Sequence, residues 1–275
     1  MSGPPGEAVF VDTPVGPQGN ETALGADFSI WMLSAMTPMA DGKTILGVFP
    51  ALKESESLPL YSTMVQMEVV DPFSLLPGAT PPFTRLGSGR LFYPNEVQYG
   101  TFALVDGIDG YLYLAGADMT GVKLARVPSD PTLWADRNHY DYYNSYTKTW
   151  QPQQPLEHNN PEGNIIKWSS LDLVGQTIGP DVGDMWYDPY HETMVMTWGD
   201  QGIDGKLWFS YAIDNNLEGP WSEPEPIWST PGPEECEGWN YQLHAHPGWD
   251  PSGKTLLISY ASCAAYVSFA KITWP

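Results

Sequence analysis

Glycine and proline interrupt this chain along its whole length. The 27 glycines and 27 prolines do not gather in one linker, and the intervals between them are mostly short runs rich in Val, Ile, Tyr, Trp and Thr. Short β-forming runs bounded by turn residues are typical of strands and turns, and they leave little room for long helices. We therefore predict an all-β protein, with strands over residues 44–49, 62–69, 101–105, 111–115, 122–127, 164–168, 184–187, 193–198, 206–213, 254–260 and 266–273.

The predicted strands recur in groups of three or four. We place such groups near residues 25–70, 98–128, 184–228 and 240–273, and a fifth in the less regular segment 140–175. A period of about 55 to 65 residues is typical of propeller blades. The sequence therefore predicts a five-bladed β-propeller, a single domain over residues 1–275, in which the apolar segment 7–12 supplies an outer strand that closes the last blade. A pair of β-sandwiches is the alternative, but it gives no reason for the recurring group.

Charge restricts the partners. The chain carries 33 acidic and 12 basic residues, a formal net charge of -21, which repels phosphate backbones and anionic lipid surfaces. No apolar run approaches the roughly 18 residues that a membrane helix needs. With 12 Trp, 15 Tyr and 9 Phe, the chain has ample apolar surface for a folded core. We expect a folded monomer with no nucleic-acid or membrane partner.

Three features favour secretion. Lysine is scarce, Asn20 begins the glycosylation sequon Asn-Glu-Thr, and Cys236 and Cys263 lie where a loop before one strand could reach the strand that pairs with it. The two cysteines form either a disulfide or two unconnected thiols, because spacing does not establish proximity. We expect an extracellular glycoprotein with a Cys236–Cys263 disulfide.

Several stretches together resemble a known group of proteins. The stretches LGADFSIW, GDMWYDPYHETMVMTWGD, YAIDNNLEGPWSEP and YQLHAHPGWDPSGKTLLISY are similar to the five-bladed propeller glycoside hydrolases. Within that group the chain most resembles the family called domain of unknown function 4185, related in fold to glycoside hydrolase family 43. The similarity touches each predicted blade and covers most of residues 25–273. It implies a secreted enzyme or enzyme-like protein that acts on a polysaccharide, with its site at the axial end of the propeller. We expect that no cofactor is required.

Hydrolysis of a glycosidic bond needs two carboxyl groups, one to protonate the leaving group and one to attack or to activate water. The resemblance places Asp27 where family 43 carries its first-blade aspartate, as base or nucleophile, although Phe28 replaces the usual proline. Asp184 opens another predicted blade and is our choice for the general acid, with Asp181 as its neighbour and rival. Glu96 opens the second blade and could orient the acid. Each of these carboxylates could instead be an ordinary turn or loop residue.

Other side chains are candidates for substrate binding. Trp186 and Tyr187 adjoin Asp184 and could form an apolar wall against it. His244 and His246 share one face of a strand, because alternate side chains point the same way, and we expect both to face the central funnel. They could bond a sugar hydroxyl, hold a structural cation in the channel, or satisfy backbone groups. We expect no zinc site, because they lack an obvious third ligand.

Arg126 stands in an arginine-poor chain and either holds an acidic residue in place or meets a uronate. We predict a secreted glycoside hydrolase acting on an arabinan-type or related cell-wall glycan. The alternatives are a non-catalytic lectin that binds glycans in the same funnel, and a polysaccharide lyase in which His244 and Arg126 would be central.

Overall fold

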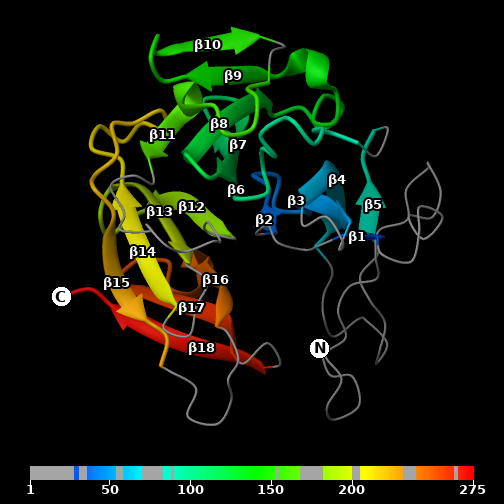
Figure 1. The fold of residues 1–275 in the computed structure, drawn as a ribbon. Helices are drawn as coiled ribbons and strands as arrows, with labels where there is room; N and C mark the ends of the chain where they lie inside the picture. Colours follow the sequence, from blue (N-terminus) through cyan, green and yellow to red (C-terminus); the bar gives the residue numbers. More distant parts are fainter. Residues whose placement is uncertain are drawn as a thin grey trace, which may run out of the picture.

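The structure is a computed structural model, and it describes residues 28–30, 36–53, 58–69, 83–87, 90–152, 155–167, 182–199, 205–231, 240–262 and 266–275. Four antiparallel sheets lie around a common centre (Figure 1). Within these ranges the only helical segments are three single turns of 3₁₀ helix, η2 (Arg137–His139), η3 (Pro161–Gly163) and η5 (Pro247–Trp249). The prediction of an all-β propeller is therefore confirmed.

Each sheet is a blade whose neighbouring strands mostly follow one another along the chain. Blade 1 contains β1 (Phe28–Ile30), β2 (Thr37–Pro38), β3 (Thr44–Lys53), β4 (Leu58–Glu68) and β5 (Phe83–Arg85). Blade 2 contains β6 (Ala103–Ile108), β7 (Tyr111–Asp118), β8 (Gly121–Pro128), β9 (Asp141–Asn144), β10 (Thr149–Pro152) and β11 (Asn164–Lys167). Blade 3 contains β12 (Gly183–Asp188), β13 (Thr193–Gly199), β14 (Lys206–Tyr211) and β15 (Glu225–Ser229), and blade 4 contains β16 (Tyr241–His246), β17 (Thr255–Ser262) and β18 (Tyr266–Thr273).

The innermost strands of successive blades contact one another. Thr37 on β2 donates a hydrogen bond to the Leu104 carbonyl on β6, and the Gly183 N–H on β12 donates to the Phe102 carbonyl just before β6. The Ala245 N–H on β16 donates to the Asp184 carboxylate on β12. Residues at the starts of these strands therefore meet near the centre of the molecule, although they are far apart in the sequence.

The eleven predicted strands each overlap a strand of the structure, but the prediction of a fifth blade in segment 140–175 is wrong. Of the residues described, this segment forms β9, β10 and β11, which all extend blade 2. Ala125 on β8 pairs with Tyr142 on β9, and Lys123 pairs with Asn164 on β11. The described part of the chain thus contains four blades.

Polar side chains explain why β11 joins blade 2. The Asn164 side-chain amide donates to the Thr120 carbonyl, and the Asn159 N–H donates to the Asp118 carboxylate. Both acceptors belong to the hairpin between β7 and β8. These bonds satisfy backbone groups of Thr120 and Asn159 at the edge of blade 2. In the sequence the same residues are merely polar, so the pattern does not show that they hold β11 on this blade.

Apolar residues fill the spaces between blades. Met64 on blade 1 and Leu114 on blade 2 belong to one buried cluster, Tyr113 on blade 2 and Trp198 on blade 3 to a second, and Leu207 on blade 3 to a third that includes residues of blade 4. Burial of large side chains is the main favourable term in folding. Several of the largest fully buried side chains are aromatic, among them Trp198, Tyr99 and Phe102, so aromatic residues supply much of this core.

Several predictions fall on parts of the chain outside the described residues. These are the closing strand over 7–12, the sequon at Asn20, the candidate acids Asp27 and Asp181, and the cysteines Cys236 and Cys263. Among the residues that are described, no helix has the length and apolar character needed to cross a membrane.

Candidate active site

Asp184 lies near the start of β12, the innermost strand of blade 3. The preceding residue, Gly183, packs directly against the Phe102 ring, since a Cβ at position 183 would lie 2.2 Å from the Phe102 Cζ. No larger residue fits there without displacing the ring. This close approach fixes the start of β12 against blade 2 and sets the direction of the Asp184 side chain, which is only 9% exposed.

The Asp184 carboxylate joins blade 3 to blade 4. Its Oδ2 accepts a 2.7 Å hydrogen bond from the Ala245 N–H, and its Oδ1 lies 3.4 Å from His244 Nδ1. Asp184 and His244 are 60 residues apart in the sequence. A buried carboxylate held by a backbone donor and facing an imidazole is a group whose position is fixed before any ligand binds.

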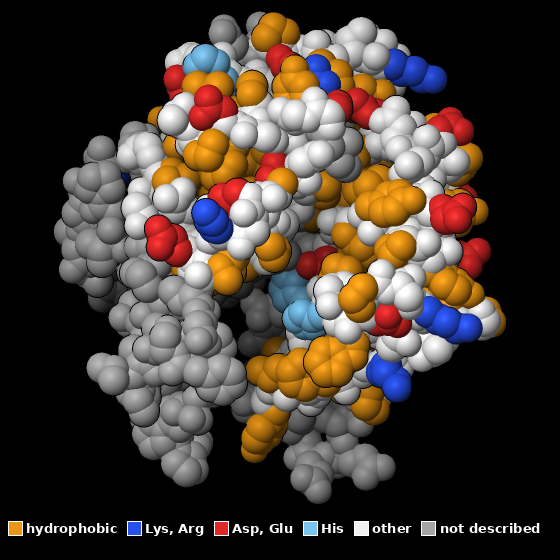
Figure 2. Space-filling model, turned by 180° about the vertical axis from the view of Figure 1, so that it is seen from behind, with side chains coloured by type: hydrophobic (Ala, Val, Ile, Leu, Met, Phe, Trp, Pro, Cys, Tyr) orange, Lys and Arg blue, Asp and Glu red, His pale blue; other side chains and the backbone are white. Residues whose placement is uncertain are grey.

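His246 occupies the next position on the same side of β16. Its Nε2 lies 2.7 Å from the Ser259 hydroxyl on β17, and Ser259 is also the strand partner of His244. His246 is exposed, whereas His244 is partly buried. Figure 2 shows histidine side chains beside an acidic side chain at a hollow near the centre of one face.

The two imidazoles differ in their affinity for a proton. Burial alone would lower the pKa of His244, but the adjacent Asp184 carboxylate outweighs burial and raises this pKa above its ordinary value of 6.5. For His246, withdrawal of part of the ring from solvent and repulsion from His244 together outweigh the attraction of Asp184, so the pKa is lowered. Near neutral pH, His244 therefore holds a proton more readily than an ordinary histidine, and His246 holds one less readily.

We predict that the two histidines titrate in the order that these causes give. Histidine ring signals followed by NMR should show His244 titrating above pH 6.5 and His246 below it. Because the pKa of His244 is raised in the folded state, the contact with Asp184 stabilises the fold fully below about pH 6.5 and progressively less as the pH rises through the folded pKa.

The substitution Asp184→Asn tests whether the Asp184 carboxylate is what raises the pKa of His244. The substitution removes the carboxylate charge and leaves burial as the main effect, so the pKa of His244 should fall below 6.5. The exposed His139 on the far edge of blade 2 provides an internal reference signal. A His244 titration that is unchanged by Asp184→Asn would contradict this account of the site.

Glu96 is engaged within blade 2. Its Oε1 accepts a 2.7 Å hydrogen bond from the Arg137 guanidinium, and its Oε2 accepts one of 2.9 Å from the Tyr93 N–H. No contact among the described residues joins Glu96 to Asp184. A role for Glu96 in orienting the general acid stays a prediction. In the structure the Glu96 carboxylate binds Arg137 and the Tyr93 backbone N–H.

Arg126 also has partners of its own. It pairs with Asp141 at 3.3 Å and lies over the rings of Tyr111 and Trp150, with its Cζ 4.3 and 4.2 Å from the two ring centroids. This is the arrangement expected if Arg126 holds an acidic residue in place. Contact with a uronate stays a prediction.

Trp186 and Tyr187 do not line the Asp184 side chain together. Trp186 packs against the core between blades 3 and 4. Tyr187 is 51% exposed and lines a cavity at the opposite end of β12. In the part of the chain that the structure describes, no three His, Cys, Asp or Glu side chains gather as a metal site would require, and the cation in the channel stays a prediction.

The fold and this site define the chain as a β-propeller with a buried carboxylate–histidine pair at its centre. No family model matches the chain, and no curated protein matches it. Solved structures do match in fold. One is a candidate hydrolase from Bacteroides ovatus, with a TM-score of 0.57, 15% identity, and coverage of 86% of this chain and 55% of the other.

Two further structures are similar. An N-acetylgalactosamine deacetylase from F. plautii, solved with blood group B trisaccharide, has a TM-score of 0.50 and 14% identity over 98% of this chain and 77% of its own. A thermostable family 43 glycoside hydrolase has a TM-score of 0.45 and 10% identity over 87% of this chain and 70% of its own. The chain spans about half of the Bacteroides ovatus protein. At these identities the likeness concerns the fold, and membership in the domain of unknown function 4185 family stays a prediction.

Proposed function

We propose that the chain is a secreted hydrolase that cleaves a glycosidic bond in a polysaccharide. The observation that carries this proposal is the Asp184–His244 pair, buried at the centre of a propeller and held by the Ala245 N–H. A group that transfers a proton must be held in position, and it works best when its pKa lies near the operating pH. The Ala245 N–H holds Asp184, and Asp184 raises the pKa of His244 above 6.5.

The second carboxyl group in this proposal is Asp27. It directly precedes β1, which pairs with β3 on the inner side of blade 1, as β12 pairs with β13 in blade 3. The Asp184–His244 pair protonates the leaving oxygen, and Asp27 attacks the sugar or activates water. Hydrolysis requires that the two carboxyl groups lie about 5 to 10 Å apart across the scissile bond.

A second candidate is hydrolysis of an N-acetyl group on a sugar. One observation favours it: the described centre combines one carboxylate with two histidines, a set that can activate water and then protonate an amine. The similar structure from F. plautii is a deacetylase of N-acetylgalactosamine. A lectin that binds glycans in the same funnel without cleaving them is the third outcome.

Product analysis separates these activities. The wild type and Asp27→Asn are incubated with plant, fungal and bacterial polysaccharides, including arabinan and N-acetylated glycans, and both new reducing ends and free acetate are measured. We expect reducing ends from at least one polymer and about 10²-fold or greater loss in Asp27→Asn. Acetate without reducing ends would replace the glycosidase proposal with the deacetylase, and retention without either product would indicate the lectin.

A further inference from the structure

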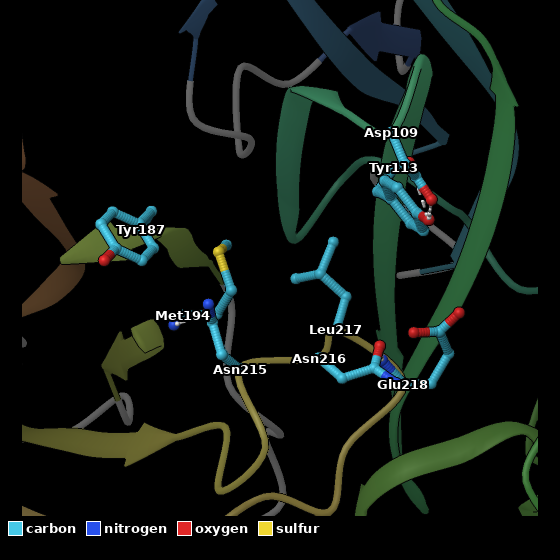
Figure 3. A pocket seen from close by; sticks show the side chains of 8 residues that line it. All are labelled: Asp109, Tyr113, Tyr187, Met194, Asn215, Asn216, Leu217 and Glu218. Carbon is cyan, nitrogen blue, oxygen red and sulfur yellow. Dashed lines mark hydrogen bonds between the residues drawn. The ribbon is translucent and has the colours of Figure 1, made fainter. Parts of the chain in front are cut away.

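A cavity of about 470 Å³ lies between blades 2 and 3, away from Asp184 (Figure 3). Its volume is within the range of about 300 to 1,000 Å³ that small-molecule sites occupy. Asp109 and Tyr113 line it from blade 2, and Tyr187, Asn216 and Glu218 line it from blade 3. Nothing in the proposed hydrolysis uses these side chains.

Strand register shows that the cavity and Asp184 lie at opposite ends of the blades. Gly183 contacts Phe102 where β12 and β6 begin, whereas Tyr187 pairs with Met194 near the end of β12. Asp109 lies in the turn that follows β6. Tyr187 lies three positions after Asp184 along an extended strand, which is about 10 Å at about 3.3 Å per residue.

Two carboxylates in the cavity are fixed by donors behind them. The Tyr113 hydroxyl donates to Asp109 at 3.0 Å, and the Trp150 indole N–H donates to Glu218 at 2.8 Å. Burial raises the pKa of Tyr113, so its hydroxyl stays protonated and remains a donor. A carboxylate can accept several hydrogen bonds, so one donor to each of Asp109 and Glu218 leaves further acceptor capacity for a ligand.

Two amide side chains supply donors. The Asn215 side-chain oxygen accepts from the Met194 N–H at 3.0 Å, and the Asn216 side-chain oxygen accepts from the Glu218 N–H at 3.2 Å. Both oxygens accept from the backbone, and neither NH₂ group donates a hydrogen bond to a residue that the structure describes, so both can donate to a ligand. The half-exposed Tyr187 ring adds an aromatic face.

The charge around the cavity selects the class of ligand. Asp109 and Glu218 repel an anion. Arg126, which pairs with Asp141 and lies 4.2 Å from the Trp150 ring centroid, adds a positive charge beside the donor to Glu218, and this charge counts against a cation. Fixed acceptors, amide donors and an aromatic ring suit neighbouring hydroxyls and the C–H face of a neutral sugar.

We propose that this cavity is a saccharide-binding site, separate from the centre at Asp184, that takes a neutral sugar residue. The site holds a polysaccharide at the opposite end of the blades from the hydrolytic centre. The proposal does not depend on whether Asp184 is catalytic, because it rests on different residues.

Affinity electrophoresis in native gels containing neutral polysaccharides tests the site, with arabinan, arabinoxylan, mixed-linkage β-glucan and galactomannan as probes. Every protein carries Asp184→Asn, so that polymers are not degraded at the centre. We expect at least one polymer to retard the protein, and either Tyr187→Ala or Glu218→Gln to weaken binding about tenfold. Glu218→Gln removes a charged acceptor but keeps an oxygen that can accept from the Trp150 indole N–H. Tyr266→Ala, which removes a 70% exposed tyrosine from blade 4, is the matched control and should bind as before.

The Trp150 indole N–H gives a direct reading of the cavity. Its NMR signal is assigned by its loss in Trp150→Phe, and it should shift when oligosaccharides of the retained polymer are added. The proposal is overturned if no neutral polymer retards the protein, if Tyr187→Ala with Glu218→Gln leaves retardation intact, or if the indole signal responds to the cation spermidine and not to oligosaccharide.

Discussion

Asp184→Asn lowers kcat on the carbohydrate substrate by about 10²- to 10⁴-fold, the contribution expected of a positioned acid–base group. Asparagine has nearly the same shape as aspartate, and its side-chain oxygen can still accept from the Ala245 N–H. The fold should therefore be retained. What is lost is the negative charge of Asp184, which raises the pKa of His244 and so keeps a proton in the pair.

Initial rates and thermal unfolding of the same preparations measure this effect. Asp188→Asn is the matched control because Asp188 is the other buried aspartate of β12, at the opposite end of the strand, where it contacts Tyr190 and His191. We expect Asp188→Asn to lower stability but to leave the rate per folded molecule nearly unchanged. Equal losses of rate in the two variants would remove Asp184 from the mechanism.

The positions of the strands could be predicted because β-branched and aromatic runs between turn residues favour strands wherever they occur in a chain. Runs such as TILGVF and KLWFSY carry β-branched and aromatic residues between turn signals, and the structure forms β3 and β14 there. The blade to which each strand belongs was harder to predict, because it depends on contacts between distant segments. Segment 140–175 has the length of a blade, yet bonds from Asn164 and Asn159 to the β7–β8 hairpin hold it on blade 2.

The candidate site shows the same division. The sequence predicts that Asp184 and His244 lie on strands that enter the centre of the propeller, and the structure brings the two side chains together. The Ala245 N–H that holds the carboxylate could not be predicted, because a backbone donor has no signal in the sequence. Tyr187 was placed beside Asp184 from its nearness in sequence, but an extended strand separates residues by about 3.3 Å each and carries Tyr187 to the other end of the blade.

Lys123→Met should lower the free energy of unfolding by about 3 to 5 kcal/mol, the cost of removing one partner of a buried ion pair. Lys123 and Asp118 have fully buried side chains, and the Lys123 ammonium lies 2.7 Å from the Asp118 carboxylate and 2.8 Å from the Thr120 hydroxyl. Methionine fills a similar volume without charge. The loss therefore reports the uncompensated Asp118 carboxylate left in the interior of blade 2.

The pH dependence of this loss identifies its cause. Burial raises the pKa of Asp118, but Lys123 and Thr120 outweigh burial and bring this pKa below its ordinary value of 3.8. In the wild type the pair therefore stabilises the fold above about pH 4, and its contribution disappears as the pH falls through the lowered pKa. Without Lys123, burial favours the protonated acid, so the difference between wild type and Lys123→Met should shrink on acidification.

Urea unfolding at about pH 7 and about pH 4.5 measures both effects. Lys254→Met removes a lysine that is exposed on the turn before β17, and it should change stability by less than about 0.5 kcal/mol. Adding Asp118→Asn to Lys123→Met removes the unpaired charge but keeps an acceptor for Thr120, so part of the lost stability should return. If Lys123→Met costs no more than Lys254→Met at neutral pH, the ion pair does not hold the β7–β8 hairpin, and the attachment of segment 155–167 to blade 2 depends on the pairing of β11 with β8 and on the contacts of Asn159 and Asn164.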